Sequence, residues 1–300
     1  MGCELCPRRC GVDRIVRTGA CHVTQPMRVG KIMLHQWEEP CISGTRGSGA
    51  IFFAGCGLGC VYCQNYALSR GQVGQTIDPE RLAEWMQKLE EDGAQTLNLV
   101  TATQYLDGIE RALGYYRPHI PIVYNCGGYE RVETVRRIAD WVDVWLPDWK
   151  YSDSDLAAAY SHAPDYPQVA RQAICEMRRL TPENQTDQAG ILQRGLLIRH
   201  LVLPGAIDNT RGVLDAIAAE LGTDTAVSLM GQYVPPQGIE LPPQLRRKLK
   251  PLEYKIAWNY AWNKGFRNVW VQDAESADAQ YTPIFDGTYS GADGISKPIR

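Results

Sequence analysis

The chain has 300 residues, 44% of them hydrophobic and 22% charged, a composition typical of a globular protein with a substantial core. The formal net charge of -3 argues against a protein whose overall charge draws it to nucleic acid or to a membrane surface. The sequence has neither the basic start and apolar run of a secretory signal nor an apolar stretch of about 18 residues. We therefore expect a cytoplasmic protein that binds neither nucleic acid nor membrane.

Residues 1–48 are rich in Cys, Gly, Arg and Pro and form the first predicted unit, a loop-rich module with a short strand or hairpin near 29–37. Eight of the ten cysteines lie in the first 63 residues, and in a reducing compartment such clustering indicates metal or redox chemistry. A candidate metal site is formed by Cys3, Cys6, Cys10 and Cys21. Four thiolates suit either zinc or a second [4Fe–4S] cluster, and free thiols or disulfides are the remaining alternative.

From about residue 50, apolar strand-like runs alternate with helical patterns. Strands are predicted at 50–54, 96–100, 120–124, 142–146, 195–203, 225–230 and 269–272. Helices are predicted at 79–91, 106–116, 131–139, 153–160, 169–180, 210–221 and 244–264, the first of them with Asp78 as its N-cap. This α/β alternation predicts a parallel sheet over 49–273, either open and doubly wound or a barrel-like (β/α)6 array. The tail, 274–300, has no clear pattern.

Three further cysteines, Cys56, Cys60 and Cys63, follow the first strand with the spacing C-x3-C-x2-C. Iron–sulfur clusters are held by thiolates, normally four to a cubane, so three close cysteines leave one iron open to a small ligand. The intervening glycines let the backbone curl round a cluster, and Tyr62 places a ring beside the last cysteine. The alternatives are three unrelated thiols or a zinc knuckle, although zinc usually takes paired C-x2-C units.

This motif resembles that of the radical S-adenosylmethionine (SAM) superfamily, and nearly the whole chain resembles pyruvate formate-lyase-activating-enzyme-like proteins. The resemblance is carried by Gly47-Ser48-Gly49 and Phe52-Phe53-Ala54-Gly55 before the cysteines, by Gln64-Asn65 after them, and by the later segments below. It implies a partial (β/α)6 barrel with SAM bound at the open iron of a [4Fe–4S] cluster, near the carboxyl ends of the strands. It further implies cleavage of SAM, by one electron from a donor such as flavodoxin or ferredoxin, to methionine and a 5′-deoxyadenosyl radical that abstracts hydrogen.

Thr101 and Thr103 follow the second strand, where many radical SAM enzymes carry a Gly-Gly-Glu segment that holds the SAM amino group. The two hydroxyls are candidates to replace that contact, and helix capping by Thr103 is the alternative. A Gly127-Gly128-Tyr129-Glu130 segment follows the third strand, not the second, so it is interpreted as a strand-to-helix turn. Asn125, at the end of the third strand, is a candidate contact of SAM or substrate.

Asp148 and Lys150 end the fourth strand and resemble the Asp-x-Lys segment of glycyl-radical activating enzymes, in which the pair helps organise the SAM region. A strand-end salt bridge is the alternative. Arg199 resembles the arginine of the activating enzymes' Arg-x-x-x-x-Pro-Gly strand, and strand alternation points it inward toward a carboxylate.

Three functions remain open. The resemblance implies hydrogen abstraction from a glycine of a partner enzyme, that is, a protein substrate. The ferredoxin-like cysteine insert of many activating enzymes is absent after Cys63. A second alternative is therefore a radical SAM enzyme that modifies a small molecule or a protein side chain. The third alternative is a metal-stabilised binding module without turnover.

Overall fold

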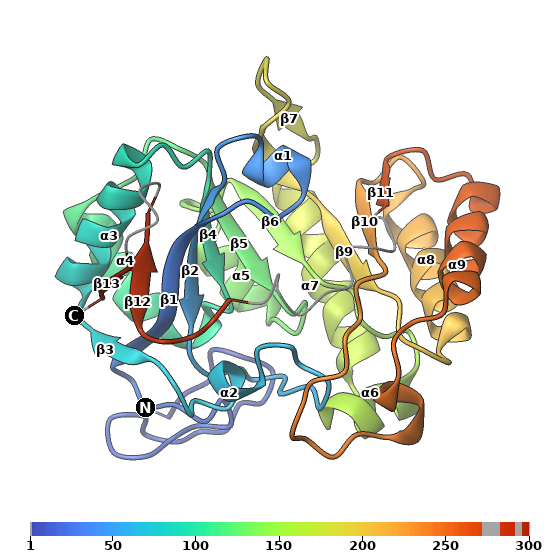
Figure 1. Cartoon of the computed structure of the whole chain (residues 1–300), viewed down its shortest axis with the longest axis horizontal. Coiled ribbons are helices and arrows are strands. Elements are labelled where there is room, and N and C mark those ends of the chain that lie inside the picture. Colours follow the sequence, from blue (N-terminus) through green and yellow to red (C-terminus); the bar gives the residue numbers. More distant parts are fainter. Residues whose placement is uncertain (1, 272–282, 292–295, 300) are drawn as a thin grey trace.

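The computed structural model describes residues 2–271, 283–291 and 296–299 (Figure 1). The strands that carry the sheet are β1 (Met27–His35), β2 (Ser48–Phe53), β4 (Leu97–Val100), β5 (Ile122–Cys126), β6 (Val144–Pro147) and β8 (Leu192–Leu196). From β2 through β4, β5 and β6 to β8, each strand pairs with the next in parallel, whereas β1 pairs with β2 in antiparallel register. The predicted parallel sheet in a mixed α/β chain is therefore confirmed.

A second parallel sheet consists of β9 (Ile198–Leu201), β10 (Val227–Met230) and β11 (Val269–Val271). Only Leu197 separates β8 from β9, and a parallel bridge between Asp148 and Arg199 continues the array from the end of β6. The single strand predicted at 195–203 is thus two short strands, each serving a different neighbour. Among the described residues β11 pairs with β10 alone, so closure into a (β/α)6 barrel stays a prediction.

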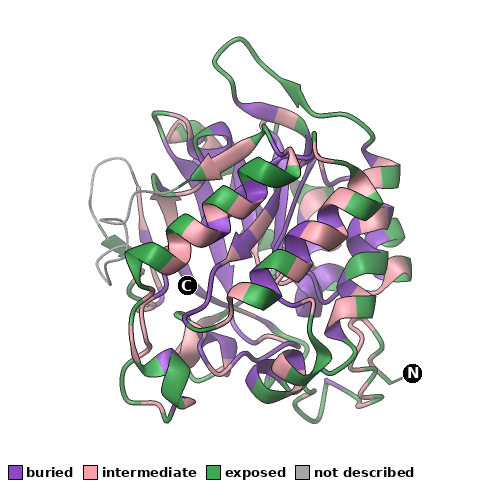
Figure 2. Cartoon of the chain, turned by 90° about the vertical axis from the view of Figure 1, so that its right-hand side faces the viewer, coloured by how far each residue is buried: buried purple, intermediate pink, exposed green. Residues whose placement is uncertain are grey.

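Helices connect the strands: α3 (Pro79–Glu91), α4 (Leu106–Tyr115), α5 (Val132–Ile138), α6 (Ser154–Ser161), α7 (Tyr166–Leu180), α8 (Ile207–Leu221) and α9 (Pro251–Lys264). The predicted N-cap of α3 is confirmed, because Asp78 Oδ1 accepts a hydrogen bond from the Arg81 amide at 2.8 Å. Figure 2 shows the buried strands behind helices whose outer faces are exposed, so the core lies between the sheet and these helices.

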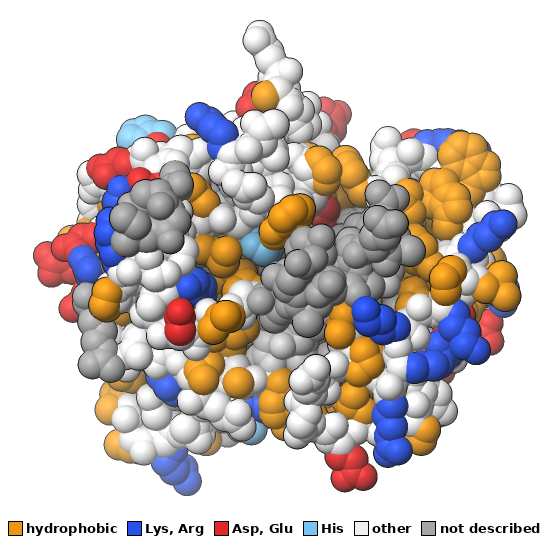
Figure 3. Space-filling model, in the orientation of Figure 1, with side chains coloured by type: hydrophobic (Ala, Val, Ile, Leu, Met, Phe, Trp, Pro, Cys, Tyr) orange, Lys and Arg blue, Asp and Glu red, His pale blue; other side chains and the backbone are white. Residues whose placement is uncertain are grey.

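The single helix predicted at 244–264 is wrong. A short 3-10 turn, η2 (Pro243–Arg246), is followed by extended backbone, and α9 begins only at Pro251. Proline disfavours helical backbone at the residue before it and suits the first helical turn, which accounts for the break. The exposed side chains of Arg246, Lys248 and Lys250 precede this helix, and Figure 3 shows Lys and Arg gathered on that side of the molecule.

Several short elements carry no sequence pattern long enough to predict them: α1 (Pro40–Ser43), α2 (Tyr66–Ser69), β3 (Gln75–Ile77), η1 (Thr103–Tyr105), β7 (Gln185–Thr186), β12 (Thr288–Ser290) and β13 (Ser296–Pro298). β12 pairs in parallel with β1, so part of the predicted tail joins the main sheet, while 274–282 and 292–295 lie outside the described residues. The predicted unit boundary at residue 48 falls on the first residue of β2, a strand that pairs with β1 along its length. None of the helices in the described ranges has the length and apolar character to span a bilayer.

Candidate functional site

The C-x3-C-x2-C segment is a loop that leaves the carboxyl end of β2 through Ala54 and Gly55. Gly55 and Gly59 have φ of 84° and 63°, values that favour glycine and let the backbone turn sharply around the thiols. Burial first, and then the neighbouring Cys60 thiol, raises the pKa of Cys56 to about 12, and the same two causes raise the pKa of Cys63. The three thiols lie in one largely buried loop, and thiolates are the ligands that iron–sulfur clusters take.

Tyr62, predicted beside the last cysteine, is buried in a cluster of tyrosines. Its hydroxyl accepts a hydrogen bond from the Tyr151 hydroxyl at 2.9 Å, and its ring meets Tyr160 and Tyr233 edge to face at 6.1 and 6.3 Å between centroids. These aromatic contacts fix the cysteine loop against the segments that follow β6 and β10 and exclude water from that side.

The N-terminal segment docks on the same loop. The Cys56 amide donates to the Cys21 carbonyl at 3.2 Å. Arg8, which lies between Cys6 and Cys10, donates from Nε to the Gly57 carbonyl at 2.8 Å and from Nη2 to the Leu58 carbonyl at 3.2 Å. A guanidinium with two carbonyl acceptors in one loop holds both segments in a fixed relation. In Figure 1 this segment lies below the sheet beside α2, at the end opposite α1 and β7.

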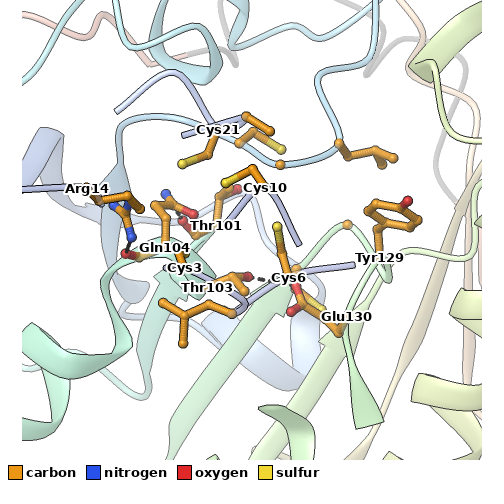
Figure 4. Close-up of a pocket in the computed structure, with 17 residues that line it drawn as sticks. Cys3, Cys6, Cys10, Arg14, Cys21, Thr101, Thr103, Gln104, Tyr129 and Glu130 are labelled. Carbon is orange, nitrogen blue, oxygen red and sulfur yellow. Dashed lines mark hydrogen bonds between the residues drawn. The ribbon is translucent and has the colours of Figure 1, made fainter. Parts of the chain in front are cut away.

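A cavity of about 40 Å³ separates the N-terminal segment from the carboxyl ends of β2, β4 and β5 (Figure 4). Its lining includes the four N-terminal cysteines together with Cys56, Cys126, Thr101, Thr103, Gln104, Arg14 and Glu130. The structure therefore brings Cys56 of the second cysteine group to the same cavity as the four N-terminal cysteines. In the described part of the chain, however, no three His, Cys, Asp or Glu side chains are grouped closely enough to hold a single metal ion.

Both candidate threonines lie at this cavity, next to the end of β4. Thr101 has φ of 59°, an uncommon backbone for a β-branched residue and one that clusters at functional sites. Thr103 Oγ1 donates to Glu130 Oε1 at 2.7 Å and accepts from the Tyr124 hydroxyl at 2.9 Å. No side chain caps η1 or α4, so helix capping by Thr103, the alternative weighed for it, is wrong.

Glu130 is a site residue that sequence reasoning missed, because its Gly-Gly-x-Glu segment follows the third strand and was interpreted as a turn. The side chain nevertheless reaches the end of the neighbouring β4. It is 4% exposed, and its Oε2 has no hydrogen-bond partner among the described residues. Burial raises the pKa of Glu130 to about 8, although the hydrogen bond from Thr103 opposes the shift. The sequence signal was present, but strand order alone assigned it to a different place.

The other predicted residues form one buried polar network. Asp148 Oδ2 accepts from Lys150 Nζ at 2.5 Å, and Asp148 Oδ1 accepts from Arg199 Nε at 2.9 Å. Arg199 Nη2 donates to Asn125 Oδ1 at 2.6 Å, and its Nη1 lies 3.3 Å from Glu38 Oε2. Although burial opposes it, Arg199 and then Lys150 lower the pKa of Asp148. The predicted inward direction of Arg199 is confirmed, and the strand-end salt bridge weighed for Asp148 and Lys150 is present.

Glu38 and Glu39 precede α1 and were not predicted as site residues, since nothing local marks adjacent glutamates before a proline as buried. Glu38 Oε1 accepts from Asn98 Nδ2 at 3.0 Å, and burial raises the pKa of both glutamates. Glu39 Oε2, His35 Nδ1 and several neighbouring polar atoms are buried without a hydrogen-bond partner within the described ranges. The interior of the sheet beside Arg199 is consequently polar, and not a purely apolar core.

Two buried histidines predict a loss of stability on acidification. Burial lowers the pKa of His35 and of His200 to about 4, below the value of about 6.5 in an unfolded chain. Between these values the unfolded state binds more protons than the folded state, so stability falls as the pH falls through that window. We expect each histidine to cost about 2 kcal/mol between pH 7 and pH 5. In urea unfolding at both pH values, His200→Gln should show a correspondingly smaller loss than wild type, and an equal loss would contradict the assignment.

No family model matches the sequence. The uncharacterized protein MJ0674 of Methanocaldococcus jannaschii is 28% identical over 269 residues, which cover 86% of this chain and 74% of that protein.

Among solved structures, SuiB of Streptococcus suis bound to S-adenosylmethionine aligns with a TM-score of 0.47 and 13% identity, covering 73% of this chain and 48% of SuiB. SuiB bound to its precursor peptide SuiA gives a TM-score of 0.48, also with 13% identity, over 73% of this chain and 46% of that one. The catalytic domain of a chitinase from Pyrococcus furiosus gives 0.36 with 16% identity, over 64% of this chain and 69% of that domain. This chain spans about half the length of SuiB, and likenesses of this strength assign no activity to it.

Proposed function

We propose that this protein is a radical SAM enzyme in which Cys56, Cys60 and Cys63 hold a [4Fe–4S] cluster with one open iron. The observation that carries the proposal is the C-x3-C-x2-C loop, largely buried at the carboxyl end of β2, which is the first strand of the parallel sheet in chain order. Ligand sites of parallel α/β folds lie at that edge of the sheet. When bound, the cluster and SAM supply the electron and the 5′-deoxyadenosyl group for hydrogen abstraction.

The chain's own residues position and shield that chemistry. Thr101 and Thr103 follow the end of β4 and offer oxygens to the amino group of SAM. Asp148, Lys150, Arg199 and Asn125 line the adjoining strand ends and present both signs of charge to a bound zwitterion. Because each charge in this network is already paired, it can orient a ligand without rearranging. The tyrosines around Tyr62 keep water from the loop.

The substrate and the electron donor belong to the same proposal. A glycine of a partner protein fits the resemblance to activating enzymes, and a small molecule or another protein side chain is the second candidate, favoured by the missing cysteine insert after Cys63. For the donor we propose an acidic carrier such as flavodoxin or ferredoxin. The exposed Arg246, Lys248 and Lys250 before α9 would attract such a partner.

The experiment is the binding of SAM to the reduced protein, followed by electron paramagnetic resonance after anaerobic reconstitution with iron and sulfide. We expect SAM to change the g values of the reduced wild-type cluster, because it binds the open iron. Cys63→Ala should lack that SAM-dependent signal. A wild-type spectrum that does not change when SAM is added would instead favour a metal-stabilised binding module without turnover.

A further inference from the structure

We propose that Cys3, Cys6, Cys10 and Cys21 ligate a second, auxiliary [4Fe–4S] cluster in the cavity beneath the SAM-cluster loop. The proposal concerns a site distinct from Cys56, Cys60 and Cys63, and it does not require that the protein cleave SAM. The sequence leaves zinc and an iron–sulfur cluster as alternatives for this site, and the proposal selects the iron–sulfur cluster.

The four thiols surround one space but do not converge on one point. Cys10 and Cys21 lie together on one wall, their Sγ atoms 3.3 and 3.5 Å from the Cβ position of Gly19. Cys6 lies against the SAM-cluster loop, its Sγ 3.1 Å from the Cβ position of Gly57. All four line the same cavity, together with the side chains of Thr103 and Glu130 (Figure 4).

This spacing separates the two candidate ligands. Zinc binds four thiolates at about 2.3 Å from a single centre, which requires the sulfurs to be grouped tightly. No three side chains are grouped that tightly within the described residues, and this holds for Cys56, Cys60 and Cys63 as well as for the four N-terminal cysteines. A [4Fe–4S] cluster takes one thiolate at each iron, at separate corners of a cube, so thiols distributed around a cavity wall suit it.

Two buried polar side chains at the cavity point independently to a bound group. Glu130 is 4% exposed and its Oε2 has no partner in the described structure, and Arg14 is 7% exposed with an unpartnered Nε. Buried polar atoms are nearly always paired, so both atoms need a partner that the protein does not supply. A cluster with four thiolates is anionic and presents sulfur acceptors, which suits the Arg14 Nε–H, whereas the Glu130 carboxylate is itself an acceptor and does not count as support for an anionic group.

The proposed cluster would touch the other cysteine site. Arg8 lies in the segment between Cys6 and Cys10 and donates to the carbonyls of Gly57 and Leu58, and the Cys21 carbonyl accepts from the Cys56 amide. Three hydrogen bonds therefore join the ligand segments of the two sites. This contact suits an electron relay from an external carrier to the SAM cluster, in which the auxiliary cluster accepts and passes on one electron.

The test uses the full chain as the Cys56→Ala/Cys60→Ala/Cys63→Ala variant, reconstituted anaerobically and assayed for iron, sulfide and zinc. We expect about four iron and about four sulfide per chain, and a loss of both when Cys6→Ser and Cys10→Ser are added. Cys175→Ser in the same background, a half-buried cysteine on α7, is the matched control and should keep the iron. Glu130→Gln should keep the iron but shift the g values of the reduced signal.

One zinc per chain without sulfide in the triple variant would overturn the proposal, and so would the absence of any bound metal. An unchanged signal in Glu130→Gln would overturn the placement of that side chain at the cluster. If the triple variant does not fold, the wild-type protein decides: about eight iron without zinc supports the auxiliary cluster, and about four iron with or without zinc contradicts it. If the wild type binds about eight iron but its reduced spectrum does not change with SAM, the proposed SAM chemistry is contradicted and the auxiliary cluster is not.

Discussion

Replacing Arg199 by methionine is expected to lower the free energy of unfolding by about 3 kcal/mol, because it leaves buried carboxylates without their cation. Arg199 bonds to Asp148 and lies 3.3 Å from Glu38, and all three side chains are largely buried. Lys150 remains beside Asp148 and limits the damage there, so Glu38 carries most of the cost. Urea unfolding of the metal-free variant and wild type, monitored by circular dichroism, measures the difference.

Two further variants make that result specific. Glu38→Gln/Arg199→Met removes the stranded charge and should recover part of the lost stability. Arg211→Met breaks an exposed pair with Asp208 on α8 and should change stability by less than about 1 kcal/mol. Equal losses in Arg199→Met and Arg211→Met would contradict the account of a buried charge network.

The second large effect is expected at Gly55, where alanine should destabilise the protein by about 2 kcal/mol or more. Its φ of 84° is unfavourable for alanine, and a Cβ would lie 2.6 Å from the Cys21 carbonyl oxygen and 2.7 Å from a Val23 methyl group. The N-terminal segment would have to move away from the cysteine loop, weakening the bond from the Cys56 amide. Thermal unfolding should register the loss, and limited proteolysis should cut the segment before β1 faster.

Gly114→Ala is the matched control. Gly114 lies in α4 with nothing within 4 Å of its Cβ position, so alanine there should stabilise the helix by up to about 1 kcal/mol. Opposite changes in the two variants would separate the close approach at Gly55 from a general effect of replacing glycine. A Gly55→Ala protein as stable and as protease-resistant as wild type would show that the docking of the two segments is not tight.

The fold was predictable wherever the determining signal is local. Asp78 and Pro79 begin α3 where capping chemistry requires it, and the apolar runs at β2, β4 and β5 become buried parallel strands. The break before α9 is the exception, because its signal, Pro251, is local and yet the sequence analysis predicts one helix through it. The division of one predicted strand into β8 and β9 at Leu197 has no local signal, because it depends on β8 pairing with β6 and β9 pairing with β10.

The site was predictable in its residue types but not in its contacts. The spacing of Cys56, Cys60 and Cys63 is a local signal, and alternation along a strand correctly pointed Arg199 inward. Glu130 contacts Thr103 across two loops, and Glu38 contacts Arg199 across 161 residues of sequence. Neither contact can be predicted from the spacing of residues in the sequence. Contacts of this kind follow from the order of strands in the sheet, which the alternation of elements does not determine.

The central claim, reductive cleavage of SAM at the loop of Cys56, Cys60 and Cys63, is tested most directly by the formation of 5′-deoxyadenosine. The protein is reconstituted with iron and sulfide without oxygen, reduced with dithionite and incubated with SAM, and the nucleoside is quantified by chromatography. We predict 5′-deoxyadenosine in the wild type and only background amounts in Cys56→Ala. A wild-type protein that carries its full iron and sulfide yet leaves SAM intact would contradict the claim.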